Sequence, residues 1–189
     1  EPVVIEKISA VDGFMQSSVN LMPTLSQGII ISDQCNGLKN GSIDFSGDTK
    51  CEVMIHYQGS HNMEAGSRVF DTDSFSFGMN VDKVRLTATI SGTEYHTIEW
   101  DELQSDGYKT MNFVWVNDQI EVYKDGVLVD AVSLPVSSTM TGSGMSFLID
   151  LAEDWAKSAS CTVKLFALYK NKVLSNRSTV VSHVNSTLI

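Results

Sequence analysis

Residues 113–129, FVWVNDQIEVYKDGVLV, constrain the fold of this chain more than any other stretch. Three short apolar runs are separated first by Asn117-Asp118 and then by Asp125-Gly126. A two-residue hairpin loop favours positive φ at both central positions, which Asp followed by Gly tolerates well. The alternation within the runs has the period of a strand with one buried face. The stretch therefore predicts a three-stranded meander, with Phe113 or Trp115 pointing into the core and the Asp125-Gly126 turn exposed.

Strand-like segments continue along most of the chain. Runs of β-branched and aromatic residues, bounded by Gly, Asn, Asp or Ser, recur about every ten residues, as in sandwiches and barrels. Outside the meander they cover residues 3–8, 28–32, 42–45, 51–57, 67–70, 74–79, 83–90, 95–100, 146–151 and 161–169. Only residues 151–157 carry a helix signal, of one or two turns. We expect an all-β chain: a two-sheet antiparallel β-sandwich of the jelly-roll type, with little helix.

Length and charge limit the remaining possibilities. A chain of 189 residues supports one well-buried core, which we place in residues 1–170. Residues 171–189 are polar with weak alternation, and predict a C-terminal tail or an edge strand. The 13 basic and 23 acidic side chains give a formal charge of −10. Because binding to phosphates needs a basic face, nucleic acid and anionic membranes are poor partners, and no apolar run has the length of a membrane-spanning helix.

Several features are typical of a secreted chain. The sequence starts at Glu1-Pro2 without a methionine, as a processed segment would. Cys35 and Cys51 flank a turn-rich segment whose ends can approach each other in a hairpin, and a disulfide there would stabilise by roughly 3 kcal/mol. Cys161 is left as a buried thiol or an intermolecular bridge.

Three tripeptides match the acceptor pattern for N-linked sugar. They begin at Asn40, Asn176 and Asn185, and two of them lie in the polar C-terminal stretch. Together with the proposed disulfide, they predict an extracellular, secreted glycoprotein.

The order of motifs in the second half of the chain resembles a known superfamily. YHTIEW (95–100), the meander and GMSFLIDLAEDWAKSASCTVKLFAL (144–168) are similar to the back half of concanavalin A-like lectin and laminin-G-type jelly rolls. CEVMIHYQGSHN followed by SRVF, FVWV before IEVYKDG, and DWAKSASCTVKL are most similar to the farnesoic acid O-methyltransferase-type domain of secreted animal proteins. The resemblance covers roughly residues 41–169. It implies a jelly roll used for adhesion or carbohydrate binding, without the transferase activity of the family's name.

The residues themselves argue against catalysis. The chain lacks the Gly-rich loop between a strand and a helix that a nucleotide-like cofactor would need. Glycoside hydrolysis requires two paired carboxyl groups, and Glu99 with Asp101 is the best local candidate. The third acid of the jelly-roll glucanase pattern is displaced to Glu102. We therefore expect a solvated acidic strand end and no enzyme.

Metal and cofactor sites are also not indicated. The four histidines, His56, His61, His96 and His183, lack a metal-binding spacing. Residues 70–74, FDTDS, place two carboxylates and two hydroxyls in one loop, which is compatible with calcium but favours a bend capped by Asp. We predict no metal and no cofactor.

A sugar ligand would need planar rings to stack on and polar groups to hold its hydroxyls. The candidate ligand-binding residues in and around the segment YQGSHN (57–62) are His56, Tyr57, His61, Asn62 and Arg68. Asp154 and Trp155, from the loop before the last strand, would complete the site, with Trp155 as the stacking platform. The competing interpretation is that Trp155 plugs one end of the sandwich.

Two functional classes remain open. The first is a binding module for a glycan or glycoprotein. The second is a self-associating subunit of an extracellular filament, matrix or viral coat, in which strand edges and an extended tail pair with neighbouring copies.

Overall fold

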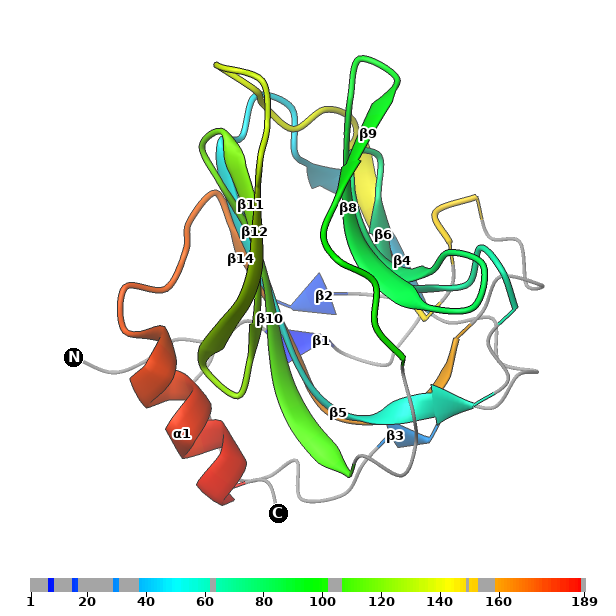
Figure 1. Cartoon of the computed structure of the whole chain (residues 1–189), viewed down its shortest axis with the longest axis vertical. Coiled ribbons are helices and arrows are strands. Elements are labelled where there is room, and N and C mark those ends of the chain that lie inside the picture. The colour runs from blue at the N-terminus through cyan, green and yellow to red at the C-terminus, as the bar shows by residue number, and fades with distance from the viewer. Residues whose placement is uncertain are drawn as a thin grey trace.

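Two antiparallel sheets face each other in a computed structural model of the chain (Figure 1). The structure describes residues 7–8, 15–16, 29–30, 38–61, 64–101, 107–148, 150–152 and 159–187. The first sheet has the order β12 (Val127–Ser133), β11 (Gln119–Lys124), β10 (Tyr108–Val116), β5 (Lys50–His61), β14 (Ser160–Lys170) and β3 (Ile29–Ile30). The second has the order β4 (Leu38–Asp44), β13 (Ser143–Phe147), β6 (Arg68–Thr72), β7 (Phe75–Met79), β8 (Val84–Ile90) and β9 (Thr93–His96). A short pair, β1 (Lys7–Ile8) with β2 (Met15–Gln16), lies apart from both sheets in the pairing. The predicted antiparallel β-sandwich is confirmed.

The meander forms one end of the first sheet. β10 pairs with β11 so that Trp115 lies opposite Ile120, and β11 pairs with β12. Asp125 and Gly126 have φ values of 49° and 84°, the positive values that the sequence predicted for this turn. Asp125 is exposed, as expected.

Aromatic side chains from the inner faces of both sheets fill the core. Phe113 and Trp115 of β10 are fully buried, which confirms that they point inward. The Phe77 and Phe113 rings are stacked with centroids 4.3 Å apart, and Trp115 meets Phe75 edge-on at 6.0 Å. Each such side chain contributes roughly 1.5–3 kcal/mol of stability by burial. These contacts hold the two sheets together.

A C-terminal helix, α1 (Arg177–Thr187), covers the outer face of the first sheet (Figure 1). Val180, Val181 and Val184 of α1 pack against Met54 and Leu165 in a second apolar cluster. The alternative of an edge strand in residues 171–189 is therefore wrong. Apolar surface on the outer face of β5 and β14 has to be covered, and a helix covers a broader area of sheet than one added strand.

A buried ion pair attaches α1 to the sheet. Glu52 of β5 is fully buried, and both of its oxygens accept hydrogen bonds from Arg177, at 2.7 and 2.9 Å. The amide of Asn112 and the backbone N–H of Leu174 donate to the same carboxylate. Four donors therefore compensate the loss of water around this charge.

One strand of the described chain is shorter than predicted. The strand predicted for residues 95–100 ends at His96, and Trp100 joins the sheet only through an isolated bridge to Val84. Thr97 caps this end by accepting a hydrogen bond from the Leu86 N–H through its hydroxyl. The helix signal at residues 151–157 falls mostly outside the described residues. No helix in the described part of the chain is long and apolar enough to cross a membrane.

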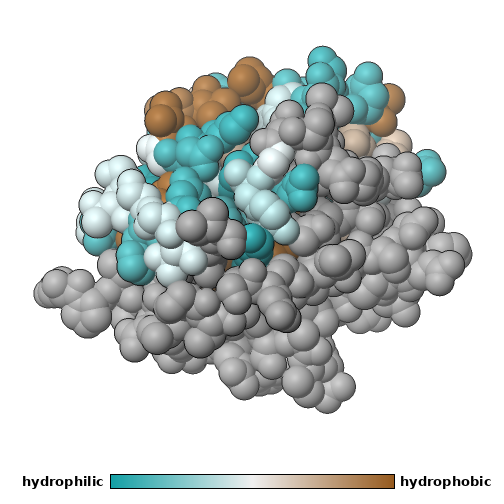
Figure 2. All heavy atoms as spheres, turned by 90° about the horizontal axis from the view of Figure 1, so that it is seen from below, coloured by the Kyte–Doolittle hydropathy of each residue, from teal (hydrophilic) through white to brown (hydrophobic). Residues whose placement is uncertain are grey.

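The edge strand β12 carries exposed aliphatic side chains. Val127, Leu128 and Val129 are 69%, 50% and 42% exposed. Their register shifts at a bulge opposite Val122 and Tyr123 of β11. Figure 2, which views the molecule from below, shows hydrophobic residues gathered at the surface near one edge. Because three consecutive aliphatic side chains are exposed on it, the β12 edge is less polar than an exposed strand edge usually is.

Candidate ligand-binding face

Polar side chains gather on the outer face of the second sheet. In β8 the apolar residues Val84, Leu86 and Ala88 point inward, so Arg85, Thr87 and Thr89 point outward. The same alternation turns Ser76 of β7 and Glu94 of β9 to this outer side. The three adjacent strands β7, β8 and β9 thus present one continuous polar surface.

Two adjoining pockets, each of about 140 Å³, lie on this surface. Both are lined by Gly66, Arg68, Ser76, Thr87 and Glu94. The first extends toward three carboxylates, Asp71, Asp73 and Asp150. The second extends toward Asn80 and Arg85. We call the two pockets and their lining residues the polar face.

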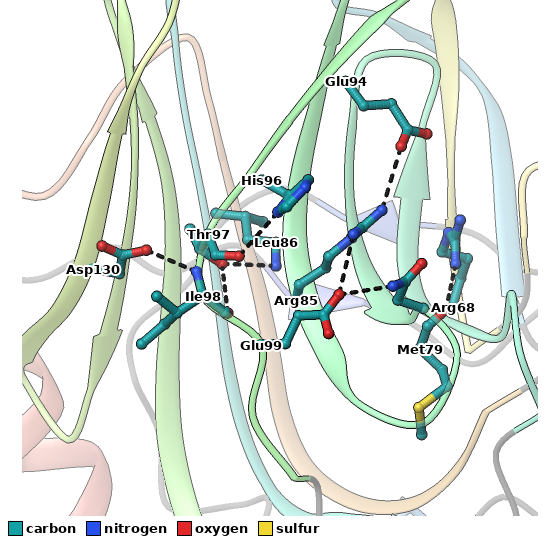
Figure 3. A network of polar contacts seen from close by, with 11 residues as sticks. Arg68, Met79, Arg85, Leu86, Glu94, His96, Thr97, Ile98, Glu99 and Asp130 are labelled. Carbon is teal, nitrogen blue, oxygen red and sulfur yellow. Dashed lines mark hydrogen bonds and ion pairs between the residues drawn. The ribbon is translucent and has the colours of Figure 1, made fainter.

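Figure 3 shows the charged network at the second pocket. Arg85 binds Glu94 at 3.3 Å and Glu99 at 3.1 Å, and the Asn80 amide donates to the same oxygen of Glu99 at 2.7 Å. The side chain of Arg85 is only 16% exposed, whereas that of Glu94 is 57% exposed. The arginine is therefore held in place, and its partner Glu94 stays accessible to a ligand.

Arg68 is fixed between the two pockets by backbone carbonyls. Its Nη1 donates to the carbonyl oxygens of Gly66, Ser67 and Met79, at 3.0–3.2 Å. The strands β6 and β7 approach so closely here that a Cβ at Gly78 would collide with the Ser67 carbonyl. Glycine at position 78 is what allows the Arg68 stem to lie against the sheet.

The surroundings of the first pocket shift the pKa of Asp71, one of the acids that line it. Burial raises the pKa of the Asp71 carboxyl to about 6, while the hydrogen bond from the Leu151 N–H and the charge of Arg68 oppose the rise. The neighbouring charges of Asp150 and Asp73 reinforce it. Asp71 Oδ2 accepts the Leu151 bond at 2.8 Å. The pocket therefore holds an acid that changes charge near neutral pH.

The structure separates three of the residues that the sequence grouped as a sugar site. His56 and Tyr57 are consecutive on β5, so they point to opposite faces. Tyr57 lies in the core between the sheets, and His56 is buried on the outer side, where its Nδ1 and the Thr110 hydroxyl are hydrogen-bonded at 2.8 Å. Arg68 is on the second sheet. Of these three described residues, only Arg68 lies on the polar face.

The other predicted ligand residues stay predictions. Asn62, Asp154 and Trp155 lie outside the described residues. His61 ends β5, and its side chain is likewise outside the description. Cys35 is not described either, so the disulfide with the buried Cys51 remains untested.

The three predicted glycosylation sites have different surroundings. Asn40 is on β4. Asn176 is exposed and precedes α1, where its carbonyl accepts from the N–H groups of Thr179 and Val180. Asn185 donates to Asp125 at 3.1 Å and accepts from the Thr110 hydroxyl. Asn176 is thus the better placed of the two helix-associated sites for carrying a sugar.

The acids considered for hydrolysis and for calcium have structural partners. Glu99 is bound by Arg85 and Asn80, and Asp101 is exposed. In the FDTDS bend the Thr72 hydroxyl bonds the backbone of Phe75, as both acceptor and donor. Among the described residues no three His, Cys, Asp or Glu side chains are arranged to hold a metal ion.

Sequence reasoning missed most of the polar face. Arg85 and Thr87 lie in the strand predicted for residues 83–90, which the sequence did not link to a site, and Glu94 lies outside every predicted strand. The signal for Arg85 and Thr87 was present in VRLTATI, where every second residue is polar. That pattern marks an outward face but does not show which other strands contribute to it.

Fold and polar face together define a class: a two-sheet antiparallel β-sandwich with a helix on one outer face and a polar, pocketed surface on the other. Solved structures that are similar to this chain include binding domains of botulinum neurotoxins and of Paraclostridial Mosquitocidal Protein 1. The binding domain of Paraclostridial Mosquitocidal Protein 1 matches 97% of this chain and 53% of its own length, with a TM-score of 0.61 and 12% identity. The receptor-binding domain of botulinum neurotoxin C/D mosaic serotype matches 82% and 44%, with a TM-score of 0.58 and 10% identity. A botulinum neurotoxin type C structure matches 74% and 36%, with a TM-score of 0.52 and 13% identity.

The chain thus spans 36% to 53% of the length of these three structures. Identities this low establish a shared fold and no more. No protein-family model and no curated protein matches the sequence. The similarity to the farnesoic acid O-methyltransferase-type domain therefore stays a prediction.

Proposed function

We propose that this chain is a secreted, non-catalytic carbohydrate-binding module of concanavalin A-like type, and that it binds its glycan on the polar face. One observation carries the proposal: the five residues that line both pockets combine a guanidinium, a carboxylate and two hydroxyls on one accessible surface. Sugar hydroxyls both donate and accept hydrogen bonds, so a surface with both kinds of partner suits them. Rigid strands hold these groups in fixed positions.

The names of the similar structures support a glycan or glycoprotein as partner. One describes cell entry of botulinum neurotoxin type C as dependent on interaction with two ganglioside molecules. Others describe a binding domain of botulinum neurotoxin DC in complex with SialylT and with rat synaptotagmin II. These partners belong to those proteins, and they direct the choice of ligands to test here.

Filling the polar face tests the proposal. Thr87 lines both pockets of the face. Thr87→Trp should abolish binding on a glycan array while leaving Tm nearly unchanged, because the new ring would occupy solvent above the sheet. Val129→Trp, on the exposed edge of the other sheet, is the matched control and should bind as the unmodified protein does.

Retention of full glycan binding by a folded Thr87→Trp variant would place the site elsewhere. The loop that contains Asp154 and Trp155 would then be the next candidate. Absence of binding to any glycan would remove the proposed function itself.

A second candidate function, assembly of copies, rests on the aliphatic edge of β12. An exposed strand edge with three consecutive aliphatic residues can pair with the same edge of a second copy. Sedimentation of the unmodified protein over a range of concentrations should then show dimers that Leu128→Lys prevents. A monomer at every concentration would rule out this candidate.

A further inference from the structure

The charge balance of the polar face carries an inference about its ligand. Five carboxylates line the pockets or bond to their residues: Asp71, Asp73, Glu94, Glu99 and Asp150. Two guanidinium groups, those of Arg68 and Arg85, stand against them. With every group ionised, the face has an excess of three negative charges.

Resting on the proposed function, we infer that the polar face selects uncharged and amine-bearing glycans and rejects glycans that carry a carboxylate or a sulfate. The excess of negative charge on the polar face repels an anion. The two arginines do little to offset this repulsion, because both are already engaged by neighbouring groups. The whole chain, with a formal charge of −10, adds to the repulsion at longer range.

Arg85 is already neutralised by its neighbours. Glu94 and Glu99 bind separate nitrogens of its guanidinium group, and the side chain is only 16% exposed. An acidic sugar that approached Arg85 would have to compete with both carboxylates. Such a sugar would gain little binding free energy, because its ion pair with Arg85 would only replace one that Arg85 already makes.

Arg68 is also engaged, through a different kind of partner. Its Nη1 donates to three backbone carbonyls, and Asp71 is the acid whose pKa its charge lowers. The guanidinium is thus positioned to donate to a sugar hydroxyl or carbonyl oxygen. It is not an isolated positive charge awaiting an anion.

The first pocket, which is lined by three carboxylates, suits ligand groups that donate hydrogen bonds. Asp71, Asp73 and Asp150 line it together with the hydroxyls of Thr72 and Thr89. Carboxylates accept hydrogen bonds from sugar hydroxyls, and these bonds are stronger than those between neutral groups. An ammonium group on an amino sugar would gain further from the negative excess.

Matched glycan pairs test the inference. The array carries each neutral oligosaccharide next to the same oligosaccharide with one added sialic acid or sulfate. The neutral member of every bound pair should bind at least several-fold more tightly. Tighter or equal binding of the acidic members would overturn the inference while leaving the proposed function intact. Silence on the whole array would overturn both.

Variants that remove negative charge from the polar face provide a second test of the inference. Glu94→Gln combined with Asp73→Asn keeps the side-chain shapes and removes two negative charges from the polar face. The preference for neutral members should narrow by about threefold per charge, as expected for unit charges several Å apart near a protein surface. Glu121→Gln removes a charge on the outer face of the other sheet and is the control. An unchanged preference in the double variant would contradict the electrostatic origin of the selection.

Discussion

Among single residues, Asp71 is placed where the fold opposes its charge. Its pKa of about 6 in the folded protein lies above the 3.8 of an unperturbed carboxyl. Between these two values the folded state binds more protons than the unfolded state. The free energy of unfolding must therefore fall as the pH rises through this window. The loss of stability caused by ionising Asp71 in the folded protein is fully present above about pH 6.

Asp71→Asn should relieve this cost. At pH 7 the variant should be more stable by on the order of 2 kcal/mol, because an amide has no charge to bury and can still accept the Leu151 N–H bond. Near pH 4 the two proteins should be equally stable. Urea denaturation at both pH values measures the difference. A variant that is less stable at pH 7 would show that the Leu151 N–H bond and the charge of Arg68 together outweigh the desolvation of Asp71 and its repulsion by Asp150 and Asp73.

At the scale of elements, the attachment of α1 depends on the buried pair of Glu52 and Arg177. Removing one partner of a buried ion pair leaves an uncompensated charge, which costs about 3–5 kcal/mol. Arg177→Ala should therefore destabilise the protein by about this amount. Denaturant unfolding monitored by far-ultraviolet circular dichroism measures it.

The control for this prediction lies on the same helix. Ser182 is exposed, so Ser182→Ala should change stability by less than about 0.5 kcal/mol. If Arg177→Ala were equally neutral, α1 would be held by Val180, Val181 and Val184 alone.

For the whole molecule, the secreted character remains a prediction with a direct test. Mass spectrometry without reducing agent, before and after glycosidase treatment, should show a bridge between Cys35 and Cys51 and sugar on at least one of Asn40, Asn176 and Asn185. Asn176 should be modified in preference to Asn185, because Asn185 uses its side chain to contact Asp125 and Thr110. An unmodified mass with three reduced thiols would contradict an extracellular location.

The strands were predictable because their signals are local. The turn at Asp125-Gly126 and the strand predicted for residues 83–90 depend on residues that are close in sequence, and both appear in the structure, the strand as β8. Helix α1 was not predicted because its sequence, RSTVVSHVNST, is made mostly of weak helix formers. The spacing of Val180, Val181 and Val184 fits one face of a helix. That face stabilises the helix only when it packs against the outer face of β5 and β14.

The sequence by itself determined the class of fold, because the period of two and the turn residues act through the backbone of each segment. Tertiary structure alone decided the polar face. Arg68, Thr87 and Glu94 come from three strands, and their meeting depends on which strands pair and in which register. It also separated His56 from Tyr57, because adjacent residues on a strand point to opposite sides of the sheet. Nearness along the chain therefore suggested a site that the pleat of β5 divides between two faces.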